Sequence, residues 1–209
     1  MSAPPSAKSG PYAGEIAPFL AIVLLAAGAG SRFSGAGHKL SAKILDGDPR
    51  TVIERSVASA LAADIGPVVV VTGAVADVVP SHLADAVTVC HNAEWANGQI
   101  TSLLVGLDAA RSLGATSVVV GLADQPFIAP EAWQAVAAHD GPIAVATYDG
   151  QRANPVKLDA EVWDLLPTVG DEGARALMRV RPELVREVAC AGSPADIDTT
   201  EDLRRWQSN

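Results

Sequence analysis

The spacing of apolar residues along the chain switches repeatedly between a pattern typical of strands and a pattern typical of helices. Residues 19–25 are continuously apolar and run directly into glycine and serine, which is typical of a buried parallel strand ending in a loop. Residues 50–63 repeat apolar side chains at helical spacing, and Gly66-Pro67 ends this helix before an apolar strand at 68–72. The pattern then predicts a helix at 75–84, a strand at 86–90, a helix at 99–112 and a strand at 117–122. Strands that alternate with helices predict an α/β sheet.

The second half of the chain is less regular. Extended segments are predicted at 143–147, 154–158 and 186–189, and helices at 159–166, 171–180 and 201–206. No repeat and no linker divides the chain, and its 209 residues suit one domain, which we place at 18–209. Residues 1–17 are rich in Pro, Ser, Ala and Gly, and we expect a flexible N-terminal tail there.

Composition narrows the range of partners. The formal net charge of -9 argues against nucleic-acid binding, because such a surface needs clustered Lys and Arg. No apolar run reaches the ~18 residues of a membrane span. The N-terminus also lacks the basic and apolar segments of a signal peptide, so we expect a cytoplasmic protein that binds no membrane. Cys90 and Cys190 lie too far apart in the sequence to form a metal-ligand motif.

The turn after the first predicted strand carries the first candidate chemistry. Glycines let the backbone approach a ligand and point N–H groups at phosphate oxygens, and Arg32 and Lys39 add positive charge. The turn consists of Leu25, Ala26, Ala27, Gly28, Ala29, Gly30 and Ser31. We expect it to bind a triphosphate; the alternative is a purely structural turn. The turn does not match the Gly-x-Gly-x-x-Gly fingerprint of dinucleotide-binding proteins, because Phe33 stands in place of the third glycine. The Gly-Lys-Ser/Thr sequence of a P-loop does not occur in the chain.

Two aspartates are candidate metal ligands. Asp124 follows the strand at 117–122, and open α/β sheets bind ligands at the carboxyl ends of their strands. A carboxylate there is well placed to hold Mg²⁺ together with substrate phosphates. Alternation around Ile197 puts Asp196 and Asp198 on one side, and Asp198 is the natural second carboxylate. The alternatives are a turn residue at Asp124 and helix capping after Asp198.

A polar loop with one aromatic residue leads into the helix predicted at 99–112. Its candidate ligand contacts are Asn92, Trp95, Gly98 and Ser102. Trp95 can stack on a flat polar ligand while amide groups read the edge of that ligand. The alternative is a tryptophan packed over a capped helix.

Together these motifs resemble the MobA-like NTP transferases in residue type and in order, over residues 20–206. The resemblance also includes Asn154-Pro155 and the segment from Gly170 to Arg175. It implies a single Rossmann-like three-layer α/β domain of the nucleotidyltransferase type, with a mostly parallel sheet. Within the family the chain looks most like the molybdenum-cofactor cytidylyltransferases, because Ala27 stands where guanylyl-transferring relatives usually have glycine.

The resemblance implies that CMP moves from CTP to the terminal phosphate of molybdopterin or the molybdenum cofactor, with release of pyrophosphate. Arg32, Lys39 and Asp124 would be catalytic, the turn with Arg32 and Lys39 would bind the triphosphate, and Asp124 and Asp198 would bind Mg²⁺. The loop 92–102, Asn154-Pro155 and residues 170–175 would face the pterin, and a molybdoenzyme would receive the product. The path from Arg32 to Lys39 is longer than usual in the family, so Lys43 is an alternative phosphate contact.

Three other functions compete with this interpretation. The donor can be GTP, or the acceptor another phosphate, within the same family. Some MobA-like proteins are described as oxidoreductases, and Gly28 and Gly30 partly imitate a dinucleotide turn, so an NAD(P)-using enzyme is a second class. A cofactor-holding chaperone is a third class, and it would keep the pocket but need not retain both Asp124 and Asp198.

Overall fold

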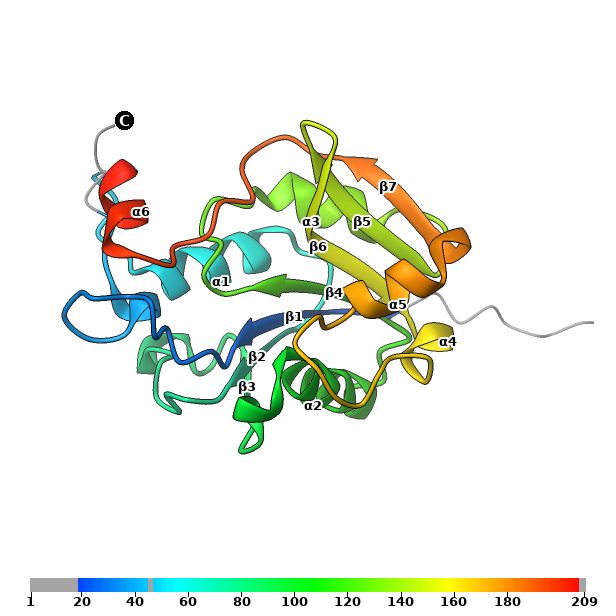
Figure 1. Ribbon diagram of the computed structural model, residues 1–209, viewed down its shortest axis with the longest axis horizontal. Coiled ribbons are helices and arrows are strands. Elements are labelled where there is room, and N and C mark those ends of the chain that lie inside the picture. The colour runs from blue at the N-terminus through cyan, green and yellow to red at the C-terminus, as the bar shows by residue number, and fades with distance from the viewer. Residues whose placement is uncertain (1–18, 45–46, 207–209) are drawn as a thin grey trace, which may run out of the picture.

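The computed structural model describes residues 19–44 and 47–206, which fold around one seven-stranded sheet (Figure 1). The strands are β1 (Leu20–Ala26), β2 (Val68–Thr72), β3 (Thr88–His91), β4 (Ser117–Leu122), β5 (Ile143–Tyr148), β6 (Gln151–Asp159) and β7 (Val185–Ala189). Their order is β3-β2-β1-β4-β6-β5-β7, and only β6 runs antiparallel to its neighbours. The predicted mostly parallel α/β sheet is confirmed. The tail predicted at 1–17 lies outside the described residues.

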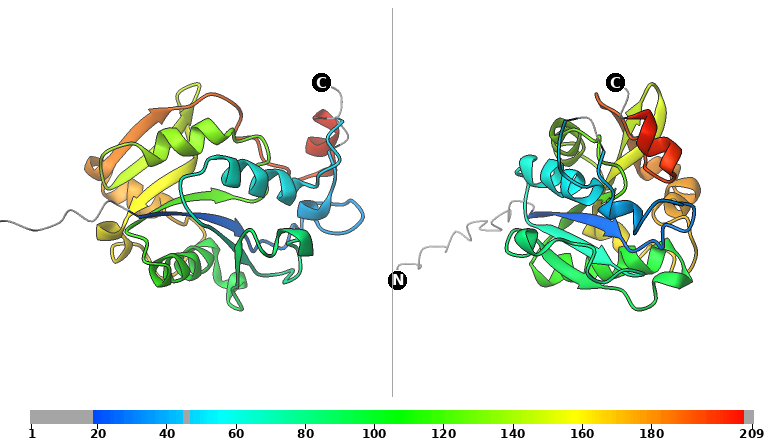
Figure 2. Two further views of the ribbon diagram at one scale, coloured as in Figure 1. Left: turned by 180° about the vertical axis from the view of Figure 1, so that it is seen from behind. Right: turned by 90° about the vertical axis from the view of Figure 1, so that its left-hand side faces the viewer.

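Helices cover both faces of this sheet and make three layers (Figure 2). One face carries α1 (Val52–Ala62) and α3 (Pro130–Ala137), and the other carries α2 (Gln99–Ser112), α4 (Ala160–Trp163) and α5 (Arg175–Val180). The last helix, α6 (Thr200–Arg205), lies beside the loop that follows β1. Within the described ranges, no helix has the length and apolar character needed to cross a membrane.

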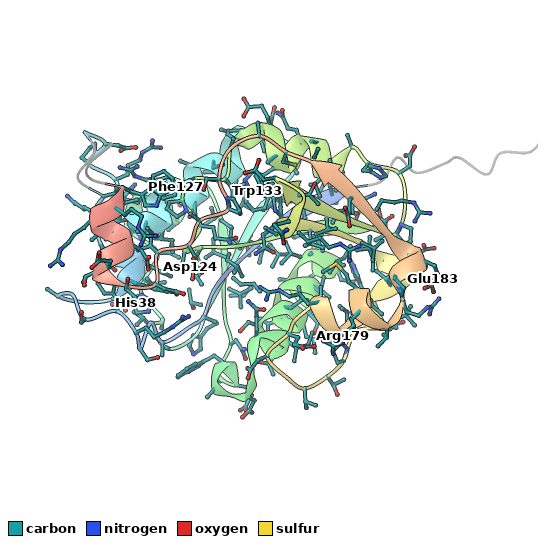
Figure 3. The ribbon with its side chains drawn as sticks, turned by 45° about the horizontal axis from the view of Figure 1, so that its top comes forward. His38, Asp124, Phe127, Trp133, Arg179 and Glu183 are labelled. Atoms are coloured by element: carbon teal, nitrogen blue, oxygen red, sulfur yellow. The ribbon has the colours of Figure 1, made fainter. Side chains whose placement is uncertain are left out.

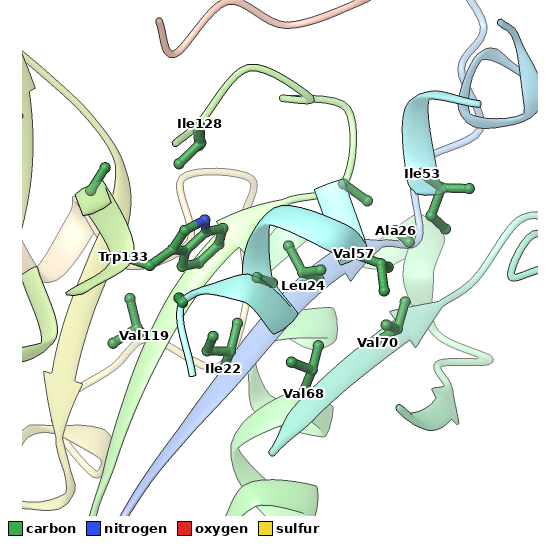
Figure 4. Close-up of a cluster of buried hydrophobic side chains, with 14 of the residues drawn as sticks. Ile22, Leu24, Ala26, Ile53, Val57, Val68, Val70, Val119, Ile128 and Trp133 are labelled. Carbon is green, nitrogen blue, oxygen red and sulfur yellow. The ribbon is translucent and has the colours of Figure 1, made fainter. Parts of the chain in front are cut away.

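The central strand β1 is buried on both faces, which explains its continuous apolar sequence. Ile22 and Leu24 point towards α1 and α3, whereas Ala21 and Val23 belong to the cluster under α2. Trp133 of α3 is the largest fully buried side chain and packs over the first of these clusters (Figure 4). Burial of each large apolar side chain contributes about 1.5–3 kcal/mol, so this core holds the helices against the sheet.

Several helices differ from the prediction. The helix predicted at 75–84 is wrong: the chain there is irregular except for a 3₁₀ turn at Ser81–Leu83, because Pro80 supplies no N–H for a continuous helix. The structure also contains α3, which begins at Pro130 and which the sequence pattern was not used to predict. Helices α4 and α5 are shorter than predicted, and α5 begins only after Gly173, whose φ of +53° lies outside the helical region.

The fold brings the ends of two neighbouring strands to one edge. β1 pairs in parallel with both β2 and β4, so the chain order reverses at β1, and Leu25 lies opposite Leu122. Ligands of open α/β sheets bind at such a switch point, outside the carboxyl ends of the strands. The turn after β1 and Asp124 after β4 therefore face the same edge.

Candidate functional site

The turn after β1 presents free backbone donors. The N–H groups from Gly28 to Arg32 have no acceptor within the described residues. The carbonyl of Gly28 is occupied: it accepts a hydrogen bond from His38 Nε2 at 3.0 Å, while His38 Nδ1 accepts from Leu40 N–H. The long connection from Arg32 thus folds back onto the turn through His38. A run of N–H groups without an internal acceptor suits an anion.

Lys39, Asp124 and Asp198 meet at this edge although they are far apart in the sequence. Lys39 Nζ donates to Asp124 Oδ2 at 2.6 Å and to Asp198 Oδ1 at 2.7 Å. Arg32 Nη2 reaches the other oxygen of Asp198, Oδ2, at 2.7 Å. Only 10% of the Lys39 side chain is exposed, whereas 74% of the Arg32 side chain is. The four predicted residues therefore form one cluster, with Lys39 as its buried cation.

Backbone contacts fix the two carboxylates relative to each other. The N–H of Ala123 donates to the carbonyl of Leu25 at 3.0 Å, which extends the β1–β4 pairing to the residue before Asp124. The N–H of Ile197 donates to the carbonyl of Asp124 at 2.9 Å. The Ile197 side chain is fully buried in the core, so the segment carrying Asp198 is anchored beside the end of β4.

Helix capping holds the other side of Asp198. Thr199 caps α6, and Asp202 Oδ2 accepts from the N–H of Asp198, from the N–H of Thr199 and from Thr199 Oγ1. These bonds lower the pKa of Asp202, with the hydrogen bond from the Thr199 side chain as the main cause. The capping predicted as an alternative is present together with the carboxylate cluster, and it positions Asp198.

The carboxylate pair fits a divalent cation in its chemistry. Asp124 Oδ1 is buried and has no hydrogen-bond partner among the residues that the structure describes, so it keeps a free lone pair beside the cluster. Oxygen donors of this kind suit Mg²⁺, which is usually held by one or two carboxylates together with substrate phosphates. No group of three or more His, Cys, Asp and Glu side chains that could hold a metal occurs in the described part of the chain. Burial, followed by repulsion from Asp198, raises the pKa of Asp196.

A pocket of about 330 Å³ joins the turn to the polar loop. Its lining includes Ala27, Gly28, Lys39 and Asp124 from the strand ends, and Trp95, Gly98 and Ser102 from the loop and the start of α2. Several predicted residues thus share one pocket, whereas Ala29, Gly30, Ser31, Arg32 and Asp198 are not part of its lining. Figure 3 shows His38 and Asp124 at the end of the molecule where α6 lies.

Asn92 has a different place from its three companions. It is buried, and its side-chain Nδ2 donates to Thr101 Oγ1 and Ser102 Oγ, both at 2.9 Å, while Oδ1 accepts from Glu94 N–H. Its amide is therefore used within the loop, and Asn92 does not line the pocket. Asn92 thus connects the loop that precedes α2 to the first turn of that helix, and its hydrogen bond positions Ser102.

Gly73 and Gly98 allow the segments that line this pocket to pack close together. A Cβ at Gly73 would lie 2.7 Å from both Ala27 Cβ and Trp95 Cβ, so only glycine fits between turn and loop. Gly98 has φ +112°, and a Cβ there would lie 2.4 Å from the carbonyl oxygen of Gly170. That carbonyl accepts from Ile100 N–H at 3.2 Å. The segment after Gly170 is thereby attached to the start of α2.

A second pocket, of about 540 Å³, adjoins the first and shares Leu25, Gln99 and Leu122 with it. Apolar side chains of the sheet, of α2 and of α5 line part of it, and Asn154 and three arginines add polar groups. The arginines are Arg152, Arg175 and Arg179. Arg152 and Arg179 pair with Glu187 and Glu172, whereas Arg175 has no acidic partner within hydrogen-bond distance among the described residues.

Lys43 is the alternative phosphate contact indicated by the sequence. It is exposed, pairs through its backbone with Thr51 and lines neither pocket. Sequence reasoning missed His38, which had no motif around it, and Gln125. Gln125 accepts from Asn154 Nδ2 at 3.0 Å and donates to the carbonyl of Pro194 at 2.9 Å, so it connects β6 to the segment before Asp198. Its place directly after Asp124 was the available signal.

Comparison with known proteins gives one family match and several relatives. A model of the MobA-like NTP transferase domain matches residues 22–188. A protein named nicotine blue oxidoreductase, from Paenarthrobacter nicotinovorans, is 31% identical over 197 residues, which are 88% of this chain and 94% of that protein.

Solved structures share the fold. A nucleotidyl transferase from Methanothermobacter superposes with a TM-score of 0.78 at 24% identity, covering 91% of this chain and 96% of that one. A Mycobacterium tuberculosis protein solved in complex with manganese gives a TM-score of 0.72 at 27% identity, covering 90% and 98%. The three-layer fold described above, a sheet with helices on both faces, is thus a fold that known nucleotidyltransferases have.

Proposed function

The chain belongs to the MobA-like NTP transferase family, and we propose that it moves CMP from CTP to the terminal phosphate of molybdopterin or the molybdenum cofactor. The observation that carries this proposal is the pair of adjoining pockets with a carboxylate cluster at the edge of one of them. A transferase must hold its two substrates side by side, and two adjoining pockets suit this. The cluster lies beside the free N–H groups of the turn, where a donor triphosphate would be bound.

In this proposal the donor occupies the pocket of about 330 Å³. The N–H groups of the turn from Ala27 to Ser31 bind the triphosphate, and Arg32 neutralises part of its charge. Trp95 and Ser102 then face the base, because they line the same pocket as Ala27, although the family resemblance had suggested that their loop faces the acceptor. The methyl group of Ala27 narrows this pocket and favours a pyrimidine.

The acceptor occupies the pocket of about 540 Å³. Its apolar lining suits the flat body of a pterin, and Arg175, whose guanidinium forms no hydrogen bond with the neighbouring Glu172 in the described part of the chain, offers that guanidinium to an anionic group of the acceptor. The shared wall at Leu25 and Leu122 brings the two substrates next to each other.

The reaction needs no covalent enzyme intermediate. An oxygen of the acceptor's terminal phosphate bonds to the α-phosphorus of CTP, the bond to the bridging oxygen breaks, and pyrophosphate leaves in line. Asp124 and Asp198 would hold Mg²⁺, which supplies neutralisation of charge on the phosphates. The manganese bound by the M. tuberculosis relative supports a divalent cation here. The chain's own residues act by positioning and by charge.

An NAD(P)-dependent oxidoreductase is the second candidate, favoured by the name of the relative from P. nicotinovorans. Incubation of the protein with each NTP, Mg²⁺ and molybdopterin tests the first candidate, and fluorescence titration with NADPH tests the second. Acceptor-dependent pyrophosphate release, lost in Asp124→Asn and kept in Lys43→Met, supports nucleotidyl transfer. Saturable NADPH binding without pyrophosphate release from any NTP would favour the oxidoreductase.

A further inference from the structure

Lys39 holds a position that a simple phosphate-binding role does not explain. Its ammonium group lies between the two carboxylates, 2.6 Å from Asp124 Oδ2 and 2.7 Å from Asp198 Oδ1. It is the least exposed charged group of the cluster. In the proposed function, the same two carboxylates hold the divalent cation.

The ammonium and a divalent cation cannot both use Asp124 Oδ2 and Asp198 Oδ1. Magnesium requires oxygen ligands at about 2.0–2.1 Å in near-octahedral geometry. A cation bridging Asp124 and Asp198 would therefore occupy the space in which Lys39 Nζ now lies. Arg32 already contacts the remaining oxygen of Asp198, so the pair is fully neutralised without a metal.

The side chain of Lys39 passes close to the turn after β1. A Cβ at Gly30 would lie 3.3 Å from Lys39 Cγ, so the aliphatic stem runs past the turn that carries the free N–H groups. A lysine stem has four rotatable carbons and carries its charge at the tip. Rotation of the outer part of this stem would carry the ammonium from the carboxylates towards the triphosphate that the proposed function places at the turn.

We propose that Lys39 is an exchangeable internal cation, which neutralises Asp124 and Asp198 in the free protein and is displaced by the divalent cation. The displaced ammonium then binds the donor triphosphate. This inference rests on the metal assignment of the proposed function. Its consequence is a coupling: the metal binds weakly alone and more tightly with nucleotide, because nucleotide stabilises the displaced lysine.

The test is a titration of the full chain with Mn²⁺ in the absence of nucleotide, followed by electron paramagnetic resonance of the free ion. Lys39→Met removes the ammonium and keeps an unbranched side chain, so we expect the Kd for Mn²⁺ to fall about tenfold. Lys43→Met is the matched control, because it removes the same charge from a neighbouring exposed site, and its Kd should equal that of the wild type. In a separate titration, Lys39→Met should bind CTP with Mg²⁺ more weakly.

An unchanged or higher Kd for Mn²⁺ in Lys39→Met would overturn the exchange. Lys39→Gln provides a second uncharged variant if the methionine variant does not fold, and the same fall in Kd is expected. Asp124→Asn separates the two proposals: if it leaves Mn²⁺ binding intact, the metal assignment itself fails. If Asp124→Asn loses Mn²⁺ while Lys39→Met gains nothing, only the exchange fails.

Discussion

Replacement of Ile197 by alanine tests whether the C-terminal segment positions Asp198. The Ile197 side chain is fully buried, and its N–H donates to the carbonyl of Asp124 at 2.9 Å. Ile143 is the matched control: it is also fully buried, but it begins β5, pairs with Leu158 and belongs to the core cluster on the other face of the sheet. The two substitutions therefore remove the same atoms from two places in the core.

The expected loss of stability is similar for the two variants. Truncation of a buried isoleucine to alanine costs about 2–5 kcal/mol, the sum of a transfer term and a cavity term. A domain stable by about 5–15 kcal/mol tolerates one such change. The activities should differ, because a shift of about 1 Å in a positioning group costs on the order of 10²-fold in rate. We expect Ile197→Ala to lose activity on that scale and Ile143→Ala to keep most of it.

The assay combines urea denaturation with pyrophosphate release measured well below both melting temperatures. Equal stability losses with a selective loss of activity in Ile197→Ala would support the positioning role. Equal activities in the two variants would refute it, because the anchor would then be unnecessary for the placement of Asp198.

Three further predictions concern single residues. Arg32→Ala should raise the KM for CTP several-fold and leave acceptor binding unchanged, because Arg32 lies on the donor side; unchanged CTP affinity in a direct titration would exclude that role. Asp198→Ala should lose most activity and Asp196→Ala much less, since only Asp198 contacts Lys39; the reverse order would place the metal on Asp196. Thr51→Ala should cost about 1 kcal/mol of unfolding free energy by removing the capping box of α1, measurable in urea.

Much of the fold is predictable because β1, β2 and β4 are buried on both faces and read as continuous apolar segments. The capped and strongly periodic α1 and the long α2 are equally clear. Short elements are less predictable. Residues 75–84 carry apolar side chains at suitable spacing, but packing of Val78 and a proline at 80 favour irregular chain. The helix at Pro130 carries local signals, a proline at its first position and apolar residues at helical spacing, so the sequence pattern was sufficient to predict it.

The site is predictable where chemistry follows a strand end, as it does for the turn after β1 and for Asp124. The contact of Lys39 with both aspartates is not predictable, because it joins three segments separated by 85 and 159 residues. Asn92 illustrates the opposite limit. Its residue type suits ligand recognition, yet neighbouring hydroxyl groups use its amide before any ligand can. Sequence patterns give residue chemistry, and three-dimensional neighbours decide its use.

The most direct test of the central claim is pyrophosphate release by the full chain with molybdopterin and Mg²⁺, measured with CTP and with GTP. The account predicts release that depends on the acceptor, is faster with CTP and is lost in Asp124→Asn. Faster release with GTP would contradict the cytidylyl assignment and leave nucleotidyl transfer standing. No release with any nucleoside triphosphate and this acceptor would contradict the proposed transfer to molybdopterin.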